Sequence, residues 1–160
     1  MLIGKNPLNE APEWFVKNIA ERPEECSVNV NGANVKYFIW GDKSKKPLLL
    51  LHGYNAHSFW WDHIAPSLTE NHCVVGLDFS GMGESDRREE YSQEIFVDDV
   101  KGVIDDLSWK SCTCIAHSMG GSIATLATSI YPDIFEHLIL LDSMIAVSYT
   151  HLTLPTTFGV

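Results

Sequence analysis

The sequence predicts an α/β fold in which a mainly parallel sheet carries helices on both faces. Short, continuous apolar runs bounded by turn residues are typical of strands that are buried on both faces. Between these runs lie segments whose apolar residues recur at helical spacing. Because this alternation brings the chain back to the same end of the sheet after each helix, it favours parallel pairing. The 160 residues are enough for one domain with its own core.

The chain is expected to begin with a helix and a hairpin. Pro12 precedes apolar residues at helical spacing, which predicts a short amphipathic helix over residues 12–22. Apolar and polar residues then alternate over 26–30, and a second run follows over 35–40. Asn31-Gly32 lies between them and is a strong signal for a type I′ turn, so these two strands should form an antiparallel hairpin.

The rest of the chain alternates between strands and helices. Buried strands are expected at residues 48–51, 73–77, 112–116 and 138–141. The helices between them are expected at residues 59–68, 93–107 and 120–131. Ser92 is the predicted N-cap of the second of these helices, and Pro132 ends the third.

Composition excludes several classes of partner. The formal net charge of −10 repels phosphate backbones, so no nucleic-acid partner is expected. The sequence has no apolar run near the ~20 residues of a membrane span and no apolar secretory segment, so we expect a cytoplasmic protein. Cys112 and Cys114 lack the second pair that a metal site needs. We therefore interpret them as small buried thiols and expect neither a metal nor a cofactor.

The segment from Cys114 to Ala124 has the pattern of a reactive turn. An apolar strand runs into His117-Ser118-Met119, and a helix is expected to begin at once. Ala116, Gly120 and Gly121 are small enough for a tight turn, which would lift the Ser118 hydroxyl above the carboxyl ends of the strands. The N-terminus of the following helix would offer free N–H groups and a positive dipole end there. A serine that merely caps the helix is the alternative.

Two further segments strengthen this interpretation. The run over residues 48–51 ends in His52-Gly53-Tyr54, and the next strand ends in Asp78-Phe-Ser-Gly-Met-Gly-Glu-Ser85. Together with the turn at Ser118 they resemble three motifs of the α/β-hydrolase fold superfamily. These motifs are the His-Gly-x oxyanion loop, the Asp-x-x-Gly-x-Gly-x-Ser loop and the Gly-x-Ser-x-Gly nucleophile elbow. The one departure is Ala116, where the family usually has glycine.

The resemblance implies the N-terminal half of that fold with a leading hairpin, and a serine hydrolase acting on an ester-type acyl bond of a small molecule. Ser118 would be the nucleophile, and the backbone N–H groups of Tyr54 and Met119 would form the oxyanion hole. His52, Asp78 and Ser85 would be structural. The neighbouring aromatic residues Phe59, Trp60 and Trp61 indicate an apolar pocket or ordinary core packing.

The family order of Ser, acid and His places the remaining catalytic groups later in the chain. Only 42 residues follow Ser118, so the resemblance implies a C-terminally truncated chain that lacks its base and is inactive. Asp142 ends a strand at the right edge of the sheet and is a possible acid, although such a residue is more often structural. His117 is expected to point away from Ser118, and His137 to lie at the opposite edge.

Residues 1–147 are expected to form the partial hydrolase domain. Residues 148–160 have no charge and no helical period, which predicts a non-native or irregular tail. Two other functions remain open at this point. One is a non-catalytic binding protein on the same fold, and the other is C–C bond hydrolysis or cofactor-free peroxidase chemistry at the same site. A serine at position 118 argues against the epoxide-hydrolase relatives, which use aspartate.

Overall fold

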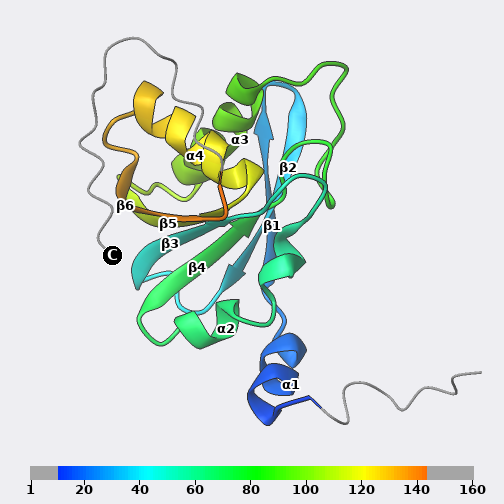
Figure 1. Cartoon of the computed structure of the whole chain (residues 1–160), viewed down its shortest axis with the longest axis vertical. Coiled ribbons are helices and arrows are strands. Elements are labelled where there is room, and N and C mark those ends of the chain that lie inside the picture. Colours follow the sequence, from blue (N-terminus) through cyan, green and yellow to red (C-terminus); the bar gives the residue numbers. More distant parts are fainter. Residues whose placement is uncertain (1–10, 144–160) are drawn as a thin grey trace, which may run out of the picture.

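The computed structural model describes residues 11–143 and contains a six-stranded sheet in the order β1-β2-β4-β3-β5-β6 (Figure 1). The strands are β1 (Glu24–Val30), β2 (Ala33–Trp40), β3 (Lys46–Leu51), β4 (His72–Leu77), β5 (Cys112–His117) and β6 (Phe135–Leu141). The helices are α1 (Glu13–Ala20), the 3₁₀-helix η2 (Ser58–Trp61), α2 (Ala65–Leu68), α3 (Gln93–Asp106) and α4 (Met119–Ile130).

Strand pairing confirms the predicted α/β fold class. β1 and β2 form an antiparallel hairpin, and β2 is also antiparallel to β4. The pairs β3–β4, β3–β5 and β5–β6 are all parallel. Asn31 and Gly32 form the two-residue hairpin loop and both have positive φ, of 49° and 89°, as a type I′ turn requires.

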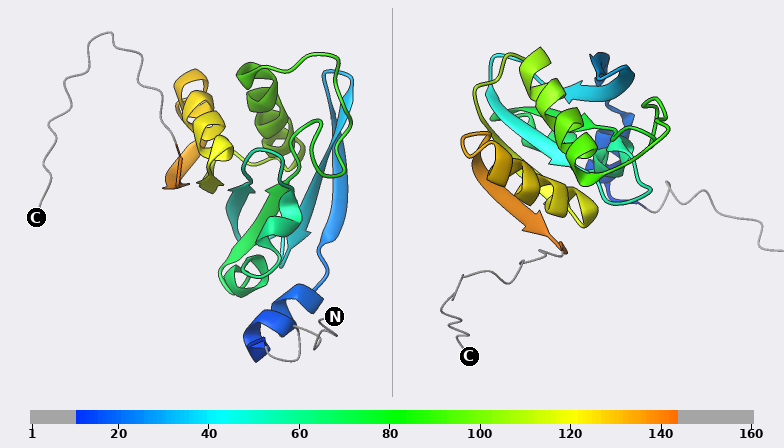
Figure 2. Two further views of the ribbon diagram at one scale, coloured as in Figure 1. Left: turned by 45° about the vertical axis from the view of Figure 1, so that its right-hand side comes forward. Right: turned by 90° about the horizontal axis from the view of Figure 1, so that it is seen from above.

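Helices cover the two faces of the sheet, as Figure 2 shows for α3 and α4 on one side. The larger apolar core lies under α3 and α4 and includes Val100, Ile104 and Ile123. A smaller core on the other face joins Trp61 and Ala65 to β-strand residues. Ser92 caps α3 as predicted, because its hydroxyl oxygen accepts a hydrogen bond from the Ile95 N–H at 3.3 Å.

The continuous helix predicted over residues 59–68 is wrong. The chain forms the short η2 and α2 helices instead. Pro66 has no N–H, and its ring would clash with the carbonyl four residues earlier, so an α-helix cannot run through it. Proline is accepted near the start of α2, where an N–H would have no helical partner.

β6 is the last strand in the sheet order. It is longer than predicted, so His137 lies within it and pairs with Thr113 near the start of β5. His137 is therefore at the edge of the sheet away from Ser118, as expected. Ile139 and Leu141 on β6 remain 46% and 41% exposed. No helix within residues 11–143 is long and apolar enough to cross a membrane. The predicted tail at 148–160 lies outside the described residues.

Candidate active site

Ser118 occupies a strained turn between β5 and α4. Its φ of 52° and ψ of −118° belong to a region that L-residues rarely adopt, and such strain costs about 1–3 kcal/mol. Two contacts hold the turn in place. The Ser118 N–H donates to the carbonyl oxygen of Leu141 at 2.9 Å, and the Ser118 carbonyl accepts from the Gly121 N–H at 3.0 Å. The sharp reversal predicted at this residue is therefore present.

The helix-capping alternative for Ser118 is wrong. A capping residue normally has extended backbone angles, and its side chain accepts a hydrogen bond from the first turn of the helix. Ser118 has neither feature, since its φ is positive and its side chain makes no capping hydrogen bond. The serine lines a cavity above the carboxyl ends of β3 and β5.

Two glycines allow the elbow to pack directly against the end of β3. A Cβ atom on Gly120 would lie 2.6 Å from the carbonyl oxygen of His52 and 2.9 Å from that of Leu51. A Cβ atom on Gly53 would lie 3.0 Å from the His117 Nδ1 atom and 3.2 Å from the Ser118 Cβ atom. The loop after β3 therefore approaches Ser118 at close contact distance.

His52 is fully buried and connects this loop to the loop after β4. Its Nε2 atom accepts a hydrogen bond from the Phe79 N–H at 3.2 Å, so the ring proton lies on Nδ1. Nδ1 donates to the carbonyl oxygen of Gly53 at 2.7 Å. Burial lowers the pKa of His52, which favours the neutral ring that this arrangement needs.

The same hydrogen bond fixes the direction of the Tyr54 N–H. The Gly53 carbonyl and the Tyr54 N–H belong to one planar trans peptide, so they point in opposite directions. The carbonyl oxygen also accepts from the Ala56 N–H at 3.3 Å. Two donors therefore hold this peptide in one orientation. Tyr54 lines the same cavity as Ser118.

That cavity has a volume of about 410 Å³ and is bordered by the loop after β3 and the elbow. Its lining residues are Gly53, Tyr54, Asn55, Ala56, His57, Trp60, His117 and Ser118. The indole of Trp60 stacks on the imidazole of His117, with centroids 5.7 Å apart and planes inclined by 14°.

The expectation that His117 points away from Ser118 is wrong, because both residues line this cavity. The alternation of side chains along a strand does not extend across a turn as sharp as the one at Ser118. The aromatic cluster in the segment after β3 divides into two roles. Trp60 is 53% exposed at the cavity, whereas Trp61 is 5% exposed and belongs to the core.

Asp78 and Ser85 stabilise the loop after β4. The Asp78 carboxylate accepts hydrogen bonds from the N–H of Ser58 at 2.6 Å and from the N–H of Glu84 at 2.8 Å. The Ser85 hydroxyl donates to the Asp78 carbonyl oxygen at 2.6 Å and accepts from the Lys36 N–H at 2.8 Å. These bonds agree with the structural roles that the sequence indicated.

Asp142 follows directly after Leu141, whose carbonyl accepts from the Ser118 N–H. It therefore lies at the same edge of the sheet as Ser118, as the sequence predicted. Asp142 is exposed, with a φ of 47°. Its role as the catalytic acid stays a prediction.

Cys112 and Cys114 are buried and unpaired, which confirms their interpretation as core thiols. Burial raises the pKa of Cys112 to about 12, so this thiol is protonated at neutral pH and is a poor nucleophile. Within residues 11–143, no group of three His, Cys, Asp or Glu side chains is placed to hold a metal ion.

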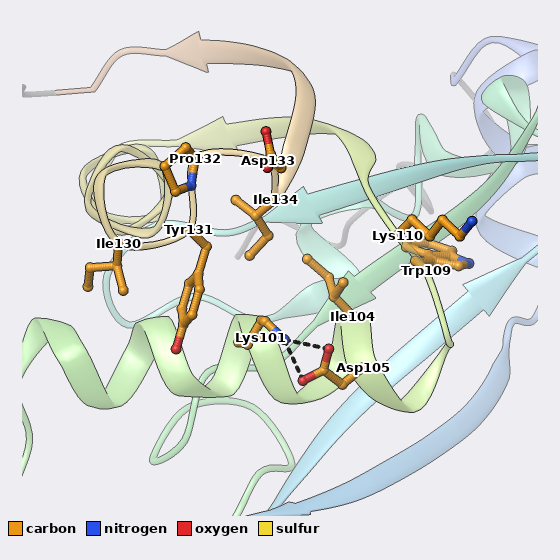
Figure 3. Close-up of a pocket in the computed structure, with 10 residues that line it drawn as sticks. All are labelled: Lys101, Ile104, Asp105, Trp109, Lys110, Ile130, Tyr131, Pro132, Asp133 and Ile134. Atoms are coloured by element: carbon orange, nitrogen blue, oxygen red, sulfur yellow. Dashed lines mark hydrogen bonds and ion pairs between the residues drawn. The ribbon is translucent and has the colours of Figure 1, made fainter.

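A second cavity of about 330 Å³ lies beside the C-terminal ends of α3 and α4 (Figure 3). Lys101 pairs there with Asp105 at 2.6 Å, and its amine lies 5.4 Å from the centroid of the Tyr131 ring. The lining residues include no serine, cysteine or histidine. Since this cavity is near the amino ends of β5 and β6, the cavity beside Ser118 is the candidate active site.

Comparison with known proteins agrees with this geometry. The family model of the alpha/beta hydrolase fold matches residues 46–157. A serine hydrolase-like protein of Danio rerio is 35% identical over 108 residues, which are 66% of this chain and 33% of that protein. Epoxide hydrolase 4 of Mus musculus is 33% identical over 122 residues, which are 73% of this chain and 34% of that protein.

Among solved structures, 2-hydroxy-6-oxo-6-phenylhexa-2,4-dienoate hydrolase from Rhodococcus sp. strain RHA1 superposes with a TM-score of 0.70 and 25% identity. The match covers 76% of this chain and 47% of that one. The chain spans about a third of the length of the curated relatives named above. The sequence motifs, the strained elbow and the family match lead to one conclusion, that the chain belongs to the alpha/beta hydrolase fold family.

Proposed function

We propose that the whole protein is a serine hydrolase that cleaves an ester-type acyl bond of a small molecule, with Ser118 as the nucleophile. The observation that carries this proposal is the backbone of Ser118. Its positive φ and its lack of a capping bond have no benefit for the stability of α4, yet they leave the hydroxyl at a cavity wall. Strain of this kind is concentrated at functional sites.

In the proposed reaction, the Ser118 oxygen attacks the carbonyl carbon of the ester while its proton passes to a histidine base. The carbonyl oxygen becomes an oxyanion that accepts hydrogen bonds from the N–H groups of Tyr54 and Met119. The Met119 N–H is in the first turn of α4 and has no acceptor within the helix. One such donor typically contributes about 10²–10³ in rate.

The tetrahedral intermediate then breaks its bond to the leaving alkoxide, which takes the proton from the histidine. Water gives a proton to the same histidine and attacks the acyl carbon of the serine ester. The bond from that carbon to the Ser118 oxygen then breaks, the oxygen takes the proton back from the histidine, and the carboxylic acid leaves. We propose that His52 acts in this cycle as a positioning residue, because it holds the peptide that carries the Tyr54 N–H. Its own Nε2 atom is occupied by the Phe79 N–H and is not available as a base.

The family order places the acid and the base after Ser118, and we propose that in the whole protein the base lies after residue 160. Asp142 is the acid candidate within the described residues. A serine hydroxyl without a base is a weak nucleophile at neutral pH. We therefore expect the 160-residue chain by itself to be inactive or nearly so.

Epoxide hydrolysis, the activity for which one relative is named, is less well supported. The family resemblance gives those enzymes an aspartate nucleophile, whereas this chain has Ser118. A non-catalytic binding protein is also less well supported, because a binding cavity does not require a strained serine at its wall.

A fluorophosphonate probe, which reacts with activated serines, tests the proposal on the whole protein. Labelling should occur at Ser118 and vanish in Ser118→Ala. It should persist in Ser129→Ala, a change at an exposed serine of the same helix whose hydroxyl donates to the Leu126 carbonyl. Absence of labelling in the folded wild-type protein would contradict the hydrolase.

The 160-residue chain provides a second measurement. We expect no hydrolysis of p-nitrophenyl acetate above the background rate. If this chain has an esterase activity that Ser118→Ala abolishes, its base lies within the 160 residues and our placement of the base is wrong.

A further inference from the structure

Half of the residues around the cavity at Ser118 carry a ring. Four of the eight residues that line the cavity carry a ring, namely Tyr54, His57, Trp60 and His117. The other lining residues are small or polar, and none is Lys, Arg, Asp or Glu. The cavity therefore offers ring faces to a bound molecule, and its lining contains no carboxylate, ammonium or guanidinium group.

Trp60 is not needed by the core. Its neighbour Trp61 is 5% exposed and packs with Phe38 and Trp40 on the sheet, whereas Trp60 is 53% exposed. A large ring left partly in water forgoes about 25 cal/mol for each Å² that it could bury. An exposed ring on the wall of a cavity is instead typical of a ligand-binding surface.

A ring contact orients Trp60 at the cavity. Its indole lies nearly parallel to the His117 imidazole, and His117 is bonded directly to Ser118 in the chain. Gly53 permits this arrangement, because a larger residue there would press on the His117 ring. A ring that already has such a contact loses less conformational freedom on binding than a ring without one, and ring pairs contribute about 0.5–1.5 kcal/mol beyond the area that they bury.

We propose that Trp60 determines the substrate class of this site, and that the substrate is an uncharged ester carrying an aromatic ring. The ring packs against the Trp60 indole while the ester carbonyl reaches Ser118. This inference rests on the proposed hydrolase function. The volume of about 410 Å³ is sufficient, since a protein cavity of about 150 Å³ holds a benzene molecule.

Binding can be measured without turnover in the 160-residue chain carrying Ser118→Ala. The ligands are phenyl acetate and methyl benzoate, whose rings lie on opposite sides of the ester, with methyl hexanoate as the aliphatic reference. Ligand-observed saturation-transfer NMR reports the binding of each. We expect Trp60→Ala to weaken binding of at least one aromatic ester by about tenfold and to change methyl hexanoate by less than about threefold.

The chain contains a matched control. Trp14 on α1 is 55% exposed, almost the same as Trp60, and packs edge-to-face on Phe15 outside the cavity. Trp14→Ala should leave all three ligands unchanged. Trp60→Phe keeps a ring at the site and should retain most of the aromatic binding. Circular dichroism and thermal unfolding verify that each variant is folded.

The inference is overturned if folded Trp60→Ala binds both aromatic esters as the parent does, or if the aliphatic ester loses as much affinity. These outcomes are distinct from failure of the hydrolase proposal, which the fluorophosphonate probe tests. If the probe labels Ser118 but Trp60→Ala binds the esters as before, only the proposed substrate class is wrong. If Trp60→Ala weakens binding of an aromatic ester but the probe does not label Ser118, the proposed hydrolase function is wrong instead.

Discussion

The loops that follow β3 and β4 begin side by side and are built in opposite ways. The two strands are parallel neighbours, with Leu51 paired to Leu77, so both loops start at one edge of the sheet. Each begins with a fully buried polar residue, His52 in one and Asp78 in the other. The loop after β3 then exposes Tyr54 and Trp60 at the cavity.

The loop after β4, residues 78–91, directs its polar groups inward. Arg88 donates to the Ser80 hydroxyl at 2.9 Å, to the Val30 carbonyl at 2.8 Å and to the Asp99 carboxylate at 2.9 Å. The Ser80 N–H also donates to Asp99 at 2.8 Å. These bonds tie the loop to α3 and to the hairpin. Two glycine-containing loops at one sheet edge therefore have different roles. The loop after β4 stabilises the fold, and the loop after β3 lines the cavity.

The largest effect should come from removing the Arg88–Asp99 ion pair, which holds the β4 loop to α3. Arg88→Met removes the cation that pairs with Asp99, whose side chain is fully buried. An unpaired buried charge typically destabilises a protein by about 3–5 kcal/mol. Chemical denaturation measures the loss in free energy of unfolding. The control is Lys43→Met at the exposed Lys43–Glu24 pair, where little change is expected. Equal losses of unfolding free energy in the two variants would contradict a stabilising role for the Arg88–Asp99 pair.

A smaller effect should come from the packing between α4 and the β3 loop. In Gly120→Ala the new Cβ meets backbone oxygens of Leu51 and His52, which cannot rotate away, so we expect a loss of about 1–3 kcal/mol. In Gly102→Ala on α3 the one contact shorter than 3.6 Å is with a side-chain methyl group, Cγ2 of Val30 at 2.4 Å, which a change of side-chain rotamer can move away. The second loss should be clearly smaller in thermal or chemical unfolding. A reversed order would show that the elbow does not pack tightly on β3.

Much of the frame was predictable because its signals are local. The Asn31-Gly32 turn, the Ser92 cap and the apolar runs of the buried strands each act within a few residues, and each appears where the sequence places it. The break at Pro66 was also readable in principle. The helical spacing of apolar residues predicts a continuous helix there, but Pro66 has no N–H with which to continue it.

The cavity was less predictable because it depends on contacts between distant segments. Position 60 meets position 117 only after the sheet is assembled, and nothing in the sequence distinguishes the exposed Trp60 from the buried Trp61. The expected direction of the His117 side chain is wrong because the alternation of side chains along β5 ends at the turn. By contrast, the sharp turn at Ser118 can be predicted from sequence, because such a turn needs small residues within a few positions of it.

The smallest effect should come from His52, which bonds to both loops, and it should depend on pH. Burial holds its pKa below the usual 6.5, so the folded protein favours the neutral ring. Above pH 6.5, protonation of this ring takes almost nothing from the free energy of unfolding. As the pH falls below that value the unfolded chain takes up the proton first, so stability decreases until the pH reaches the lowered pKa of the folded state.

One proton limits the slope of this decrease to about 1.4 kcal/mol per pH unit. His52→Gln should be less stable at pH 7.5 and should lose less stability than wild type on acidification, as denaturant titrations at several pH values will measure. His137→Gln, a change at an exposed histidine of β6, should keep the wild-type slope. If His52→Gln also kept it, the ring would not be held neutral between the two loops, and the fixed direction of the Tyr54 N–H would lose its physical basis.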